Sequence, residues 1–181
     1  MKHKDGYILL EMIISLFIIL LILMTLYSTI LVSNNNKIKI EDRVELSQQM
    51  EEIDYQLKNL IGSGIDIINI TTVDKKVVSN LEYNHNYNIS SVKINFKNQD
   101  NESNSNLKNK EISLKSNNRK LFINTLSSNN VSESGGYEIG DYVKSIYFKL
   151  ENPKLVSITL CLQKNDTILE KNIKIYMKSE S

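Results

Sequence analysis

The chain begins with a long segment in which apolar positions are almost uninterrupted. From Met12 to Val32 every residue is apolar, a Tyr or a small hydroxyl residue, and no charged residue occurs between Glu11 and Lys37. At a rise of ~1.5 Å per residue, a run of about 21 residues just spans the hydrocarbon core of a bilayer. A secretory signal peptide has a shorter apolar region followed by a small-residue cleavage site, and neither feature occurs here. The pattern predicts a membrane-spanning helix.

After the polar triplet Asn34-Asn35-Asn36, the apolar residues recur at largely helical spacing. Polar and charged residues, Asp42 among them, line the other side, and Gly62 and Gly64 supply a stop signal. We expect an amphipathic helix of about 25 residues, continuous with the membrane helix, whose apolar stripe packs on a sheet. The residues of this predicted stripe are Ile40, Val44, Met50, Ile53, Leu57, Leu60 and Ile61.

From Ile65 onward the hydrophobic period changes to two. Such alternation is typical of antiparallel strands with one buried and one solvated face. The turn residues Lys164-Asn165-Asp166 join two strongly alternating runs and predict a hairpin. No helical period follows Gly62, so the fold class predicted is α+β, with the helix covering one face of an antiparallel sheet. The strongest expected strands are Val92–Phe96, Ile146–Leu150, Val156–Leu162 and Ile173–Met177, and weaker ones are 65–70, 111–115 and 120–124.

The first residues carry a specific resemblance. The leader MKHKDG followed by YILLEMIISLFIILL resembles the N-terminal segment of type IV prepilins and pseudopilins. In that family a membrane peptidase cuts after a Gly and before a bulky apolar residue, and a Glu stands five residues into the mature chain. The resemblance implies cleavage between Gly6 and Tyr7, N-methylation of Tyr7, and a role in assembly for Glu11. Tyr7 stands where the family usually has Phe or Met, and Ile8 where it often has Thr.

The resemblance also implies an architecture and a role. A pilin-like chain would comprise a cytoplasmic leader (1–6), a transmembrane and assembly helix (7–36), an amphipathic helix (37–62) and a β-sheet domain (63–181). It would be a minor pilin or pseudopilin, a structural subunit and not an enzyme. Gly140-Asp141-Tyr142-Val143, leading into alternating strands, resembles the end of minor pseudopilins of the J or W type. Whether such a fibre serves secretion, competence for DNA uptake, adhesion or motility stays open.

The partners and location implied are those of a fibre subunit. They are the prepilin peptidase, other pilins or pseudopilins in a fibre, the inner-membrane assembly platform and membrane lipid. The chain would cross the cytoplasmic membrane once, with its C-terminal domain outside the cytoplasm, and reach a periplasmic or cell-surface fibre after assembly. Positive residues before the span, Lys2 and Lys4, favour this orientation, although Lys37, Lys39 and Arg43 after it weaken the bias.

The position of Glu11 has a physical logic of its own. Cleavage after Gly6 would create an α-amine on Tyr7, charged near neutral pH, and Glu11 lies one helical turn away on the same face. An uncompensated carboxylate in hydrocarbon costs several kcal/mol, so Glu11 could neutralise the amine of a neighbouring helix in a fibre. The alternative is that Glu11 only marks the interfacial end of an ordinary signal-anchor helix.

Composition and motifs point away from other classes. The formal net charge is +1, so no basic excess indicates a nucleic-acid surface. Cys161 is the single cysteine, His85 has no second histidine or carboxylate cluster beside it, and no catalytic fingerprint occurs. Asp100 and Glu102 lack the spacing of a calcium loop, so neither a metal nor another cofactor is expected. The alternative function is a membrane-anchored extracytoplasmic binding domain that does not polymerise, and a weaker third is a membrane-tethered enzyme.

Overall fold

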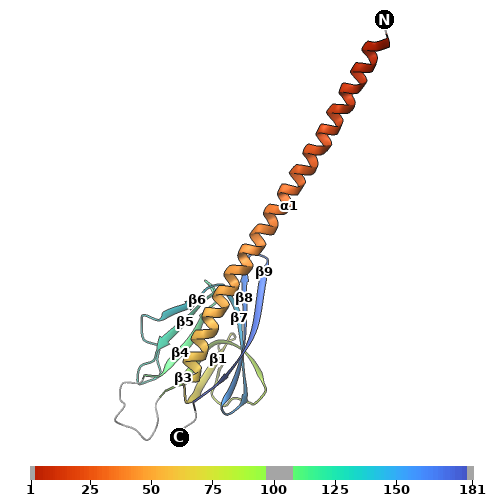
Figure 1. Ribbon diagram of the computed structural model, residues 1–181. Coiled ribbons are helices and arrows are strands. Elements are labelled where there is room, and N and C mark those ends of the chain that lie inside the picture. The colour runs from red at the N-terminus through yellow and green to blue at the C-terminus, as the bar shows by residue number, and fades with distance from the viewer. Residues whose placement is uncertain (1–2, 97–107, 179–181) are drawn as a thin grey trace. The chain divides into compact units, whose positions relative to one another are not determined.

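The computed structural model, which describes residues 3–96 and 108–178, contains one long helix followed by strands (Figure 1). Helix α1 runs unbroken from His3 to Gly62. The chain divides into two compact units between Glu41 and Asp42. The strands are β1 (Asp66–Thr72), β2 (Val77–Val78), β3 (Asn86–Asn95), β4 (Lys110–Lys115), β5 (Lys120–Thr125), β6 (Tyr137–Gly140), β7 (Val143–Asn152), β8 (Leu155–Lys164) and β9 (Thr167–Tyr176). The α+β class is confirmed.

All strand pairs are antiparallel, and the sheet forks at β3. The strand order is β6-β5-β4-β3-β7-β8-β9, with β1 and β2 attached to β3. Strand β1 occupies one edge of β3, while β7 pairs with residues 86–89 and β4 with residues 91–94 of the other edge. Two strands that share one edge must diverge beyond it. The fork therefore curls the sheet into two halves, β4–β5–β6 and β7–β8–β9.

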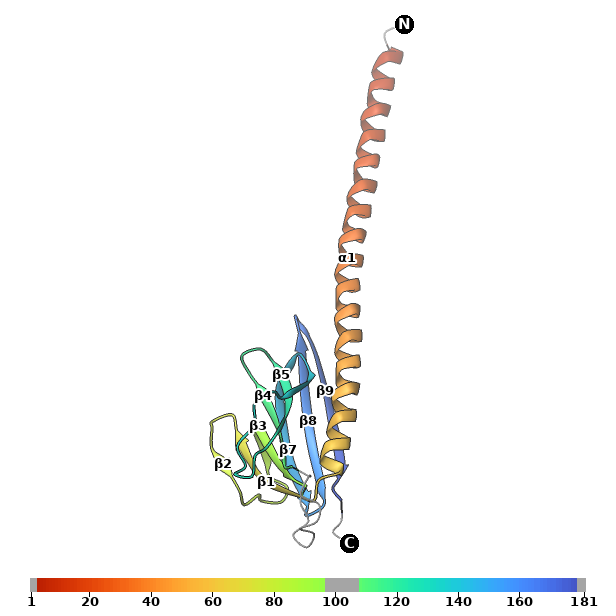
Figure 2. The same cartoon turned by 90° about the vertical axis from the view of Figure 1, so that its left-hand side faces the viewer.

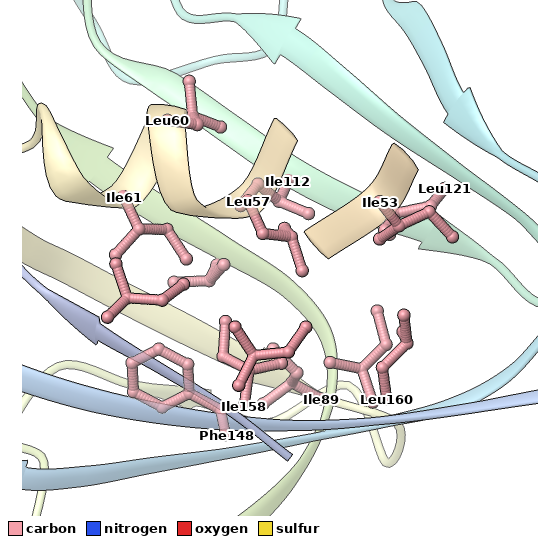
Figure 3. Packing of buried hydrophobic residues seen from close by; sticks show 14 of the residues in the cluster. Ile53, Leu57, Leu60, Ile61, Ile89, Ile112, Leu121, Phe148, Ile158 and Leu160 are labelled. Carbon is pink, nitrogen blue, oxygen red and sulfur yellow. The ribbon is translucent and has the colours of Figure 1, made fainter. Parts of the chain in front are cut away.

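The core lies between the second half of α1 and the concave face of this sheet (Figures 2 and 3). The helix contributes Ile53 and Leu57, which are buried, as are Ile112 and Leu121 from one half of the sheet. Strands β7 and β8 contribute Phe148, Ile158 and Leu160 from the other half, also buried. One face of the helix thus packs against both halves of the sheet and forms a single hydrophobic core with them.

The buried stripe of α1 differs from the predicted one at its beginning. Ile40 and Val44 are 64% and 52% exposed, whereas Leu46 is fully buried and Asp42 is only 5% exposed. Positions 42, 46, 50, 53 and 57 repeat at the period of 3.6 on one face, and Ile40 and Val44 fall on another. The prediction that placed Ile40 and Val44 in the stripe and Asp42 on the solvated side is wrong. Periodicity alone could not show where the β-domain first meets the helix.

The helix ends at Gly62, as the stop signal predicted, but without a left-handed residue. Neither Gly62 nor Gly64 has a positive φ. Ser63 donates its backbone N–H, and also its hydroxyl, to the carbonyl of Asn59. A Cβ on Gly64 would lie 2.4 Å from Cγ2 of Ile94, so close approach to β3 is what favours glycine there.

The strands predicted from alternation are all present, and the hairpin between β8 and β9 is confirmed, with Asn165 at φ 49°. Alternation missed the short strands β2 and β6. On the outer face of β8, which was predicted to be solvated, Ser157 is buried and only 4% exposed. In register it lies between Lys149 and Lys174, whose long side chains flank the small serine.

Candidate functional site

The three residues singled out by the N-terminal pattern all lie in α1. Tyr7 is 74% exposed, and its spacing from Glu11 places the two side chains one turn apart on the same helical face. Among the described residues Glu11 has no hydrogen-bond or ion-pair partner. Cleavage at Gly6, methylation of Tyr7 and pairing of Glu11 stay predictions.

The helix that carries these residues exposes a continuous apolar surface. Its most apolar window of 18 residues has a mean hydropathy of 2.9, and none of that window is buried. The hydroxyls of Thr25 and Thr29 donate to the backbone carbonyls of Ile22 and Thr25, so the polar groups at those positions are satisfied within the helix. By length and composition this segment is compatible with a membrane anchor. Exposed apolar surfaces larger than a few hundred Å² generally mark sites of contact with other proteins or with membranes.

A charged cluster fastens the start of the packed half of α1 to the β-domain. Lys164, at the end of β8, places Nζ 3.2 Å from Oδ1 of Asp42 and 2.5 Å from Oε2 of Glu45. Asn165 donates to Oδ2 of Asp42 at 2.8 Å, and the hydroxyl of Tyr142 donates to Oε1 of Glu45 at 2.7 Å. We call these five residues the helix clamp.

The charges of the helix clamp stabilise one another. The hydrogen bond from Asn165, together with Lys164, lowers the pKa of the Asp42 carboxyl. Hydrogen bonds from Lys164 and Tyr142 lower the pKa of the Glu45 carboxyl, and the bond to Glu45 raises the pKa of Lys164. Burial of Asp42 is therefore compensated by a fixed set of donors. Sequence patterns missed this cluster because the paired residues lie between 97 and 123 positions apart in the chain.

A second ionic contact lies further along the same helix. Asp54, 7% exposed, is 2.5 Å from Nζ of Lys171 on β9 and 2.9 Å from Nζ of Lys58 on the next turn. Burial alone raises the pKa of the Asp54 carboxyl, but the hydrogen bonds from Lys171 and Lys58 outweigh it and the pKa is lowered. Two separate contacts thus fix the register of α1 residues 42–62 on the sheet.

Other candidate chemistry stays dispersed in the part of the chain that the structure describes. No group of three or more His, Cys, Asp or Glu side chains gathers there in a way that could hold a metal ion. His85 packs edge-on against Tyr87, with ring centroids 4.4 Å apart, and Cys161 is a half-buried free thiol. Asp100 and Glu102 lie outside the described residues.

Comparisons of the chain with protein-family models, with curated proteins and with solved structures give no match.

Proposed function

We propose that this protein is a pilin-like fibre subunit, a minor pilin or pseudopilin that a prepilin peptidase processes at the membrane. The observation that carries the proposal is the register of the N-terminal segment. A basic leader ends at Gly6, an aromatic residue follows, and Glu11 stands at the fifth position after the glycine, directly before the apolar run. Each feature is common by itself, but their coincidence in this spacing is specific.

The architecture of α1 supports the proposal. In its first half the most apolar window has no buried residue among those that the structure describes. Its second half is held on the β-domain by the core, the helix clamp and Asp54. A subunit of this kind can be inserted as a precursor, cleaved at Gly6 and moved from lipid into a bundle of like helices. In that bundle the carboxylate of Glu11 would neutralise the α-amine of a neighbour, which sets the register between subunits.

Processing is the first test. Gly6→Val should block cleavage, because a peptidase that approaches the backbone closely at this position tolerates little side chain. Mass spectrometry of membranes from cells with an active prepilin peptidase should find wild-type protein beginning at a methylated Tyr7, and the variant with its leader. Met12→Val, which places the same side chain beyond the cleavage site, serves as the matched control and should be processed. Wild-type protein that keeps Met1 under these conditions would refute processing.

Assembly is the second test. Glu11→Ala should leave insertion and cleavage intact but reduce incorporation into fibres, because it removes the partner of a neighbour's amine. The measurement is the amount of protein in the sheared-fibre fraction relative to the membrane fraction. Ser15→Ala, one turn further on the same face, controls for general disturbance of the helix. If the Glu11 variant and wild type are incorporated equally, Glu11 is an interfacial anchor, and a domain that does not polymerise becomes the better interpretation.

A further inference from the structure

The concave face of the sheet is not completely covered by α1. Beside the last turns of the helix, a cleft of about 420 Å³ opens between α1 and strands β4, β5 and β6. We call it the open cleft, and the side chains used below are Gln56, Asn59, Lys110, Ile123, Thr125 and Tyr137, all of which line it. Its volume lies within the range of small-ligand sites in proteins.

Strand register places the polar residues of the open cleft on the core side of the sheet. Lys110 pairs with Thr125, and Ile123 pairs with both Ile112 and Tyr137. Cross-strand partners project from the same face, and alternate residues share that face. Ile112 on this face is buried in the core, so Lys110, Thr125 and Tyr137 continue the core face where the helix no longer covers it. Positions that are apolar elsewhere on this face carry hydrogen-bonding groups here.

Among the residues that the structure describes, the lining of the open cleft has one cationic side chain, Lys110, and no anionic one. Lys110 is half-buried, and Nζ lies 5.5 Å from the centroid of the Phe96 ring. Within the described residues no carboxylate comes within ion-pair distance of Lys110, and the lining of the cleft contains neither Asp nor Glu. A partly desolvated ammonium group without a counter-charge favours an anionic ligand.

The remaining groups indicate the kind of anion. The ring of Tyr137 is 66% exposed, which leaves a flat surface free at the rim of the cleft. The side chains of Asn59, Thr125 and Tyr137 make no hydrogen bond to other described residues, while Gln56 uses one N–H on Glu52 and keeps its carbonyl oxygen free. These amide and hydroxyl groups can both donate and accept hydrogen bonds.

We propose that the open cleft binds an acidic saccharide, a pyranose unit that carries a carboxylate. The ammonium group of Lys110 pairs with the carboxylate, the ring of Tyr137 packs on the C–H face of the sugar, and Asn59, Gln56 and Thr125 bind its hydroxyls. Hydroxyls on every side of the ligand match the mixed donors and acceptors of the cleft. This binding activity does not depend on the fibre role and would add a recognition function to the β-domain.

The test uses the full chain in detergent micelles and measures binding by isothermal titration calorimetry and saturation-transfer NMR. The probes are a galacturonic acid trimer and a neutral galactose trimer. Lys110→Met should weaken binding of the acidic trimer by about tenfold or more, which corresponds to the loss of one charged contact. Tyr137→Ala should also weaken it, because it removes the ring on which the sugar packs. Lys115→Met is the matched control, because Lys115 lies on the same strand, points to the opposite face and also contacts an aromatic ring, that of Phe122 at 4.3 Å.

The expected result is saturable binding of the acidic trimer to wild type and to Lys115→Met, and much weaker binding of the neutral trimer. Circular dichroism melts of the three variants should match wild type, so that a loss of binding reports on the site. The proposal is overturned if the acidic trimer does not saturate the protein at millimolar concentration, if both trimers bind equally, or if Lys110→Met and Lys115→Met weaken binding to the same extent.

Discussion

The contact between Gly140 and Ile53 gives the sharpest test of how α1 packs on the sheet. A Cβ on Gly140, at the end of β6, would lie 2.3 Å from Cδ1 and 2.4 Å from Cγ1 of Ile53. Ile53 is fully buried and cannot turn its side chain into solvent. The φ of Gly140 is not positive, so alanine suits the backbone and the cost of Gly140→Ala is steric. Overpacking of this kind costs about 1–3 kcal/mol of unfolding free energy.

Two further variants serve as controls for the destabilisation expected of Gly140→Ala. A Cβ on Gly62 would meet only the carbonyl oxygen of Tyr176 at 3.5 Å and Cγ2 of Ile175 at 3.9 Å, which are ordinary contacts. Gly62→Ala should therefore stabilise by about 0.4–1 kcal/mol, because it restricts the unfolded chain. Ile53→Ala alone should cost about 2–5 kcal/mol. In that background Gly140→Ala should cost nothing, since the new methyl group enters the vacated volume.

The assay is urea unfolding of the full chain in detergent micelles, followed by far-UV circular dichroism, with the free energy obtained from midpoint and slope. The double-mutant cycle between residues 53 and 140 should give a coupling free energy of at least ~1 kcal/mol. Equal stability of the Gly140→Ala and Gly62→Ala variants would refute the close contact. An undiminished penalty for Gly140→Ala in the Ile53→Ala background would also refute it.

Three other outcomes follow from the structure. Ile158→Asp should destabilise the β-domain by more than ~3 kcal/mol, because it buries an unpaired charge. Ile158→Val should cost only ~0.5–1.5 kcal/mol. Similar circular dichroism melts of the two variants would contradict the burial of Ile158. The carboxyls of Asp42 and Glu45 have lowered pKa values in the folded state. Their contribution to the stability of the fold is therefore complete above their unfolded pKa values near ~4, and it is lost as the pH falls through the lower folded values. The urea midpoint of wild type should fall on acidification in that range, and Lys164→Met should make the midpoint less dependent on pH. Identical pH profiles of the two proteins would exclude the helix clamp as the cause of the acid destabilisation. A fragment of residues 37–181 should be a soluble, folded monomer by size-exclusion chromatography and circular dichroism, and aggregation would show that the packed half of α1 cannot complete the core by itself.

Local periodicity determined most of the elements of this protein. The apolar run after Glu11, the change from helical to alternating period near Ile65 and the turn at Asn165 depend only on near neighbours in the chain. The structure has a helix, a change to strands and a hairpin at these places. The peptidase motif is also a local pattern, so the sequence alone carries the proposal for Gly6 and Glu11. The short strand β2 was not predicted, because two residues are too few to show an alternating pattern.

Tertiary structure alone decided which helical face is buried and which polar groups meet. The sequence pattern predicts that Asp42 is solvated, but Lys164 and Asn165, from the far end of the chain, bind its carboxylate. The same pattern predicts that Ile40 is buried, whereas its side chain is 64% exposed. The fork at β3 depends on the pairing of β4 and β7 along one edge of that strand. The open cleft around Lys110 depends on where α1 ends relative to strands distant in sequence. Whether a residue is buried depends on which other elements pack against it. The hydrophobic period along the chain does not contain that information.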